Sequence, residues 1–186
     1  MKKIAISGKA GSGKDTLSKF LCQEEENSKK IAFSDPIKEM VRIIYPQIPR
    51  KHLFGSSKYR DNIIPNSFKD GIPLTIRHLL QDIGEGYKVY NPKIWIETFH
   101  QTVKKCENKG AKLIINSDLR FIDEFNYLIG EDFYLIRIIK DDVKNINHIS
   151  ETQQDQISND QFNKIIYNNG SLKELEEQAK KIINSL

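Results

Sequence analysis

The chain has 186 residues, of which 38% are hydrophobic and 29% are charged, and its formal net charge is +4. This length favours one domain with a substantial core, and the composition excludes a disordered chain. No apolar run approaches the roughly 20 residues of a membrane-spanning helix, and the first residues lack the pattern of a secretory signal. We therefore expect a cytoplasmic protein with no membrane partner.

Strands and helices are expected to alternate along the chain, because short β-branched runs are followed by segments with helical spacing of apolar residues. The expected strands are 3–7, 31–33, 112–116, 133–139 and 164–167. The expected helices begin near residue 16 and then span 36–45, 75–83, 91–108, 120–129 and 171–186.

Two stretches interrupt this alternation. Residues 46–72 are punctuated by proline and glycine, so we expect them to be mostly irregular, with a short helix around 51–54. Residues 141–163 are polar and show almost no apolar periodicity. The remaining order of elements predicts an α/β fold with a mainly parallel five-stranded sheet and helices on both faces.

The most informative segment follows the first strand, where residues 8–16 read G-K-A-G-S-G-K-D-T. The spacing G-x-x-x-x-G-K between a strand and a helix is typical of a phosphate-binding loop. Such a loop directs backbone N–H groups and a helix N-terminus at the β-phosphate, and its lysine adds a positive charge. We expect a P-loop three-layer sandwich whose ATP-binding residues are Gly8, Lys9, Gly11, Ser12, Gly13, Lys14, Asp15 and Thr16.

Asp15 stands where this loop usually has Ser or Thr, whose hydroxyl binds Mg²⁺. Two substitutes are open: the Asp15 carboxylate acts on the metal, directly or through water, or Thr16 supplies the hydroxyl. We favour Asp15, although a carboxylate in the first helical turn also suits a purely capping role.

A second chemical segment follows the apolar residues 113–115, where the chain reads N-S-D-L-R-F. Ligands of open α/β sheets bind at the carboxyl ends of the strands, and Asp118 and Arg120 are expected there. Asp118 suits a metal-binding acid and Arg120 a phosphate clamp, whereas the alternative is a surface ion pair. A GTPase is disfavoured because the sequence contains no N-K-x-D segment.

Several segments in order resemble the phage-type deoxynucleoside monophosphate kinases, which are distant relatives of animal phosphomevalonate kinase. The most specific is the G-K-D-T end of the loop, and the resemblance covers nearly the whole chain. The other matching segments are D-P-I-K at 35–38, I-R-H-L-L-Q-D-I-G at 76–84, Trp95, D-L-R-F-I-D-E at 118–124, H-I-S-E at 148–151 and N-N-G-S-L at 168–172.

The resemblance implies transfer of the γ-phosphoryl group of ATP, with Mg²⁺, to the 5′-phosphate of a (deoxy)nucleoside monophosphate. It implies a single kinase domain over 1–186, with an acceptor-binding insertion at 36–110 and a lid at 141–163. It also suggests a homodimer with small-molecule substrates and no nucleic-acid partner.

The expected catalytic residues are Lys14, Asp15, Asp118 and Arg120, of which Asp15 and Asp118 would bind the metal. Trp95 would stack on or wall the acceptor base, or belong to the core. The expected substrate-binding residues are Asp35, Lys38, Arg77, Gln81, Trp95, Asp118, Arg120 and Glu124.

Two features leave alternatives open. Asp35 is placed where hydroxyl-phosphorylating kinases carry an acid that accepts the hydroxyl proton, so a nucleoside or dephospho-coenzyme A kinase remains possible, as does an ATP-gated binding protein. The chain has no arginine after Arg137, so either Lys140 and Lys144 or Arg120 and Arg137 would supply the positive charge of a lid.

Overall fold

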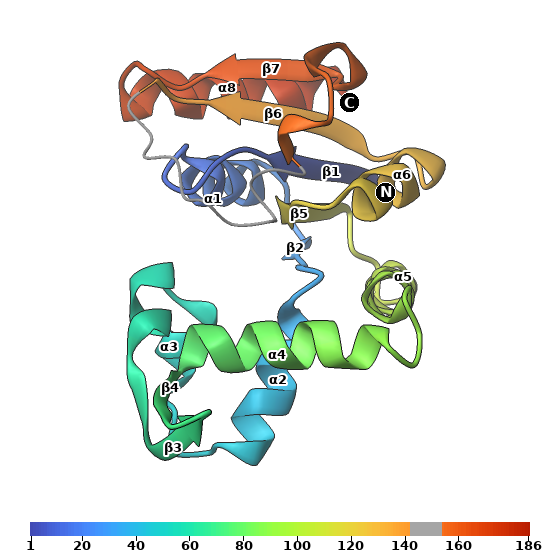
Figure 1. Cartoon of the computed structure of the whole chain (residues 1–186). Helices are drawn as coiled ribbons and strands as arrows, with labels where there is room; N and C mark the ends of the chain where they lie inside the picture. The colour runs from blue at the N-terminus through green and yellow to red at the C-terminus, as the bar shows by residue number, and fades with distance from the viewer. Residues whose placement is uncertain (142–153) are drawn as a thin grey trace. The chain divides into compact units, whose positions relative to one another are not determined.

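The computed structural model (Figure 1) describes residues 1–141 and 154–186. Most of the expected lid, including Lys144 and the 148–151 motif, therefore lies outside the described residues. The chain forms two compact units, which we call the sheet unit (Met1–Ala32 with Phe99–Leu186) and the inserted unit (Phe33–Thr98).

The sheet unit is built on five strands that are all parallel, in the order β2-β5-β1-β6-β7. The order of the strands in space differs from their order in the chain, as expected when helices connect parallel strands. The strands are β1 (Lys2–Ser7), β2 (Ser28–Lys30), β5 (Leu113–Leu119), β6 (Tyr134–Ile139) and β7 (Lys164–Tyr167).

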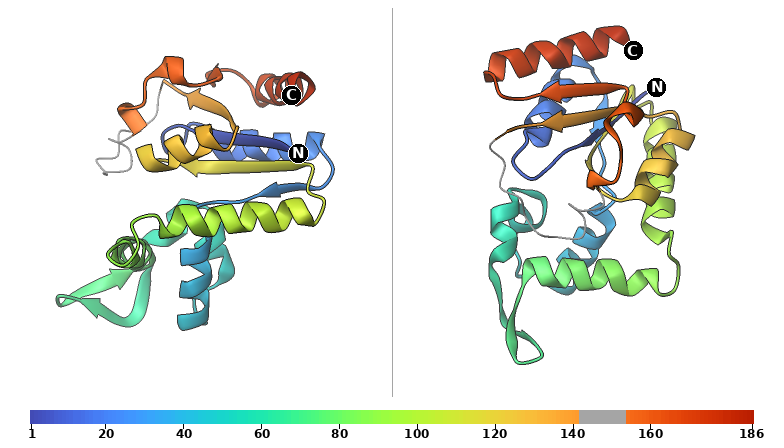
Figure 2. Two further views of the ribbon diagram at one scale, coloured as in Figure 1. Left: turned by 90° about the vertical axis from the view of Figure 1, so that its right-hand side faces the viewer. Right: turned by 45° about the horizontal axis from the view of Figure 1, so that its top comes forward.

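Helices cover both faces of this sheet, which confirms the predicted three-layer architecture. α1 (Lys14–Glu24) and α8 (Leu172–Ser185) lie on one face, and α6 (Ile122–Gly130) lies on the other (Figure 2, left view). Alternate strand residues such as Ile4 and Ile115 pack with Leu21 of α1 and Ala179 of α8 in one buried cluster. Ser171 caps α8 by accepting a hydrogen bond from the Glu174 backbone N–H.

The inserted unit has its own small core around Val41, Leu53 and Ile64. α5 (Ile94–Asn108) begins in this unit and ends in the sheet unit. The other elements of the inserted unit are α2 (Asp35–Ile44), α3 (Arg50–Phe54), the 3₁₀ helix η1 (Ser57–Asp61), β3 (Ile63–Lys69), β4 (Ile72–Thr75) and α4 (Ile76–Lys88).

Two sequence predictions were wrong in detail. The stretch expected to be irregular contains the antiparallel hairpin β3-β4, whose turn residues Asp70 and Gly71 both have positive φ, at 51° and 76°. Asp-Gly is a strong hairpin signal, but Pro65, which lies within β3, argues against a strand there. The second strand is Ser28–Lys30 rather than 31–33. The apolar residues Ile31, Ala32 and Phe33 are buried where the chain leaves the sheet, so their apolar character reflects burial and not a strand.

No helix among the described residues is both long enough and apolar enough to pass through a lipid bilayer.

Candidate active site

The loop after β1 has the backbone geometry of an anion cradle. Gly13 immediately precedes α1 and has φ 105° and ψ 9°, a left-handed conformation that strains any residue with a Cβ. A Cβ added at Gly8 would lie only 2.4 Å from the carbonyl oxygen of Ile138 and 2.8 Å from the Ser12 hydroxyl. Glycine at both positions is therefore a steric requirement of this loop.

Lys14 lies over the loop that precedes it. Its Nζ donates a hydrogen bond to the carbonyl oxygen of Lys9 at 2.8 Å and another to that of Gly8. An ammonium group held by two carbonyls in the loop is available to exchange these acceptors for phosphate oxygens. The role of Lys14 in phosphate binding stays a prediction.

The Ser12 side chain offers a second polar group in the loop. Its hydroxyl is buried and has no hydrogen-bond partner among residues 1–141 and 154–186. Buried polar groups are rarely left unpaired, and a bound phosphate oxygen would satisfy this donor. The loop therefore fits an anion by both its backbone and its side chains.

A cavity of about 290 Å³ adjoins the loop in the sheet unit. Lys9 lies on one side of it and forms a 3.6 Å ion pair with Asp155. Arg137 of β6 also lines the cavity, and its guanidinium donates to the Asn159 side chain and to the Gln154 carbonyl, each at 2.7 Å. Arg137 therefore anchors the chain that returns to the sheet at β7, while its half-buried charge contributes to the potential of the cavity.

Asp15 and Thr16 occupy the first turn of α1. The Asp15 carboxylate is exposed and accepts a hydrogen bond from Lys30 Nζ at 2.6 Å, whereas Thr16 is half-buried. An exposed carboxylate in this turn can reach a metal through water, and it also complements the helix dipole. The choice between the two residues stays a prediction.

Asp118 is held at the carboxyl end of β5 by a residue that the sequence analysis did not single out. The buried Asn116 amide donates to Asp118 Oδ1 at 2.8 Å and to the Ile31 carbonyl at 3.2 Å. Its own oxygen accepts from the Asp118 backbone N–H at 3.3 Å. The only signal in the sequence was an amide inside an apolar strand, which must find partners when buried.

Glu124 is only 8% exposed and closes the turn between β5 and α6. Its Oε2 accepts hydrogen bonds from the backbone N–H groups of Arg120 at 2.9 Å and Phe121 at 3.1 Å. Burial, followed by the negative charge of Asp118, raises the pKa of Glu124 to about 8. Glu124 is therefore mostly neutral at pH 7 and positions the backbone that carries Arg120.

The remaining predicted residues belong to the inserted unit. Lys38 is buried and forms a 2.8 Å ion pair with Asp35 at the start of α2. Arg77 on α4 pairs with Asp61 at 2.6 Å, and this hydrogen bond lowers the pKa of the Asp61 carboxyl. Lys38 and Arg77 thus lie on helices of the inserted unit, and their role in substrate binding stays a prediction.

Trp95 is 9% exposed, and its indole N–H donates to the Gly84 carbonyl at 2.8 Å. Its ring meets Tyr87 edge to face. Trp95 thus packs α5 against α4, while Gln81 is half-buried on α4. Contact of either residue with an acceptor base remains a prediction.

The residues of the sheet unit fit a metal ion whose ligands are mainly the phosphate groups of a nucleotide and water. Within the described ranges, no group of three or more histidine, cysteine, aspartate or glutamate side chains is arranged to hold a metal ion. Mg²⁺ usually binds one or two carboxylates together with phosphates and water. Asp15 and Asp118 supply carboxylates of that kind.

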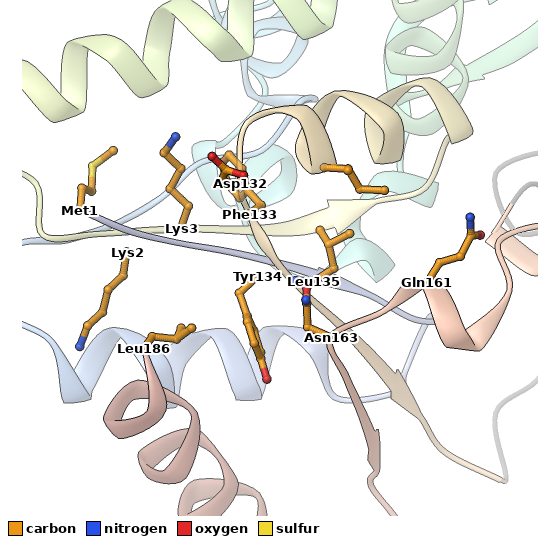
Figure 3. A pocket seen from close by; sticks show the side chains of 11 residues that line it. Met1, Lys2, Lys3, Asp132, Phe133, Tyr134, Leu135, Gln161, Asn163 and Leu186 are labelled. Carbon is orange, nitrogen blue, oxygen red and sulfur yellow. Dashed lines mark hydrogen bonds between the residues drawn. The ribbon is translucent and has the colours of Figure 1, made fainter.

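A larger cavity, about 620 Å³, opens at the amino ends of β1 and β6 (Figure 3). Lys2 and Lys3 line it but point to opposite faces of the sheet, as successive strand residues do. Lys2 donates to the Ile183 carbonyl at 3.1 Å, and Lys3 donates to that of Glu131 at 2.9 Å. This cavity is at the edge of the sheet opposite the phosphate loop and is not part of the same site.

A glycine loop and helix at the carboxyl edge of a parallel sheet define a P-loop nucleotide-binding protein. A family model described as deoxynucleotide monophosphate kinase matches residues 47–179, and the chain therefore belongs to that kinase family. The resemblance predicted from the sequence and the classification as a phosphotransferase are thereby confirmed. The matched region begins after the phosphate loop, so the loop is separate support for nucleotide binding.

Solved structures support the same fold. One neighbour is TT1252 from Thermus thermophilus, with 15% identity, a TM-score of 0.54 and coverage of 100% of this chain and 97% of that chain. Another is the tunicamycin resistance protein of Deinococcus radiodurans, with 14% identity, a TM-score of 0.52 and coverage of 98% and 95%. The comparison with curated proteins gave no match.

Gly13→Ala should destabilise the chain by more than about 1 kcal/mol, because the left-handed backbone disfavours a Cβ. The added carbon would also lie 2.3 Å from the Asn168 side-chain nitrogen. The control is Gly86→Ala in α4, where no heavy atom lies within 4 Å of the new carbon. That variant should be unchanged or more stable by up to about 1 kcal/mol in urea denaturation. Equal effects of the two substitutions would contradict the loop geometry.

Glu124→Gln should weaken the pH dependence of stability. The folded chain holds the Glu124 proton up to about pH 8, whereas the unfolded chain releases it near the ordinary value of 4.5. The free energy of unfolding therefore falls as pH rises through this window, by on the order of a few kcal/mol. Gln keeps an oxygen for the two N–H groups but does not titrate.

Urea denaturation at about pH 5 and about pH 8 measures this difference. Asp123→Asn, at the exposed neighbouring position, is the matched control and should behave like the parent protein. The assignment fails if Glu124→Gln keeps the parent's full fall in stability between the two pH values.

Proposed function

We propose that the chain transfers the γ-phosphoryl group of ATP to the 5′-phosphate of a (deoxy)nucleoside monophosphate, which yields the diphosphate. The observation that carries this proposal is the phosphate loop after β1 beside β5, whose carboxyl end bears Asp118 and Arg120. Membership of the deoxynucleotide monophosphate kinase family supports the same reaction. The base and sugar of the acceptor are left open.

The reaction needs positioning and charge more than it needs a base. An oxygen of the acceptor phosphate attacks the γ-phosphorus, the bond to the β,γ-bridging oxygen breaks, and ADP leaves with the electron pair. A phosphate monoester near pH 7 already presents ionised oxygens, so no side chain has to remove a proton.

The charges proposed for this task come from the loop and from β5. Lys14 exchanges its two loop carbonyls for β- and γ-phosphate oxygens, and the Ser12 hydroxyl and loop amides complete the cradle. Arg120, fixed through its backbone by Glu124, clamps a phosphate group. Because Glu124 is mostly neutral at pH 7, it adds little repulsion toward these anions.

Mg²⁺ fits this arrangement as a partner of ATP. Asp15 and Asp118 would hold it, directly or through water, and Asn116 orients the Asp118 carboxylate. When bound, the ion would neutralise charge on the transferring phosphoryl group.

The acceptor is proposed to bind through the inserted unit. Its cations Lys38 and Arg77 are the candidates for the acceptor phosphate, and Gln81 and Trp95 are the candidates for its nucleoside. Asp35 contributes here by holding the Lys38 ammonium group at 2.8 Å.

Incubation with ATP, Mg²⁺ and separate panels of nucleoside monophosphates and nucleosides tests the proposal. ADP release should require a monophosphate. Release only with hydroxyl acceptors would replace the proposal with a nucleoside-type kinase, and no release with either would indicate an ATP-binding module.

Lys14→Ala should lower kcat/KM by about 100-fold or more, while Lys19→Ala at an exposed position of α1 should not.

The metal role of Asp15 is tested separately. Asp15→Ala should raise the Mg²⁺ concentration for half-maximal rate by about 10-fold or more, because a carboxylate in the metal's environment is lost. Thr16→Ala is the comparison and should change this concentration much less. The reverse result would assign the role to Thr16.

A further inference from the structure

The N-N-G-S-L segment at 168–172 has no role in the function proposed so far, yet it begins against the phosphate loop. Asn168 is the first residue after β7. Its Nδ2 donates a hydrogen bond to the Ser12 carbonyl at 2.8 Å, across 156 positions in the sequence. Both residues belong to the sheet unit.

We propose that Asn168 is a positioning residue that holds the phosphate loop in its anion-binding conformation and thereby sets the affinity for the nucleotide triphosphate. This inference rests on the proposed function only in taking the loop as the ATP site. It does not depend on the identity of the acceptor.

The peptide bond between Ser12 and Gly13 connects this hydrogen bond to the backbone N–H groups of the loop. A trans peptide is planar, so its C=O and N–H point in opposite directions. With the Ser12 carbonyl fixed on Asn168, the Gly13 N–H points away from Asn168. One hydrogen bond from Asn168 thus orients a main-chain donor at the start of α1, and a helix N-terminus favours an anion.

The position of Asn168 is itself well defined. Its backbone N–H donates to the Ile139 carbonyl at 2.7 Å, which continues the β6-β7 pairing by one residue. The side chain therefore projects from a backbone position that is held by strand pairing, and a partner held in this way can orient the loop.

The fit between Asn168 and the loop is close on both sides. A Cβ at Gly13 would lie 2.3 Å from Asn168 Nδ2, so the amide occupies the space that any larger residue at Gly13 would need. Glycine at this position serves the left-handed backbone and the approach of Asn168 together.

The next residue offers a matched comparison. The Asn169 amide bonds to Asp141, donating to Oδ2 at 2.7 Å and accepting from the backbone N–H at 3.1 Å. It has the same side chain in the same segment, but its bonds go to the end of β6 rather than to the loop. Loss of the Asn169 side chain therefore removes two hydrogen bonds without releasing the Ser12 carbonyl.

The experiment measures nucleotide binding and kinetics in Asn168→Ala, Asn168→Asp and Asn169→Ala. Isothermal titration with a non-hydrolysable ATP analogue gives Kd, and steady-state kinetics give kcat and both KM values. Thermal melting without nucleotide monitors folding. If the aspartate variant does not fold, the alanine variant still decides.

Asn168→Ala should raise Kd for the analogue and KM for ATP by about 5- to 10-fold, the effect of one lost hydrogen bond, and leave KM for the acceptor within about twofold. Asn168→Asp should raise them further, because a carboxylate cannot donate to the Ser12 carbonyl and repels the triphosphate. Asn169→Ala should stay within about twofold of the parent.

Parent-like Kd in both Asn168 variants would overturn the inference, as would equal increases in both KM values or a fall in melting temperature alone. A parent protein that binds the analogue but phosphorylates no monophosphate would refute the proposed function while the binding data still decide on Asn168. A parent protein that does not bind the analogue would overturn both.

Discussion

The parallel direction of all five strands is the constraint on which the candidate site depends. Because the strands point the same way, the phosphate loop after β1, the acid and arginine at the carboxyl end of β5, and Asn168 after β7 all come to one edge of the sheet. Residues separated by more than 150 positions in sequence therefore contribute to one cradle. Lys14 donates hydrogen bonds to two carbonyl oxygens of the loop, so the proposed nucleotide binding would exchange existing contacts and would not have to build the cradle.

The fold was largely predictable because its signals are local. Short β-branched runs, helical spacing and capping residues such as Thr75 and Ser171 each depend on a few neighbouring positions. The predicted elements were wrong where two local signals conflicted, or where an apolar run showed that a segment is buried but not whether it is a strand. Pro65 obscured the hairpin signal of Asp70 and Gly71, and the apolar residues from Ile31 onward are buried without being the strand.

The site was predictable in part for the same reason. The glycine loop is defined by its own spacing, and Asp118 and Arg120 follow from the end of an apolar strand. The roles of Glu124 and Asn168 could not be derived from the sequence in this way. The raised pKa of Glu124 depends on burial and on a second carboxylate, and the partner of Asn168 is known only once β7 lies next to β6 and the loop. Both effects depend on residues that only the tertiary structure brings together.

Asn116 connects the Asp118 carboxylate to the path of the chain at the edge of the sheet. One amide group donates to the Asp118 carboxylate and to the carbonyl of Ile31, just before the chain enters the inserted unit. If the backbone at Ile31 shifts, the amide must lose a partner or turn, and turning it redirects the carboxylate. One amide group thus connects the segment that leads into the inserted unit with the Asp118 carboxylate.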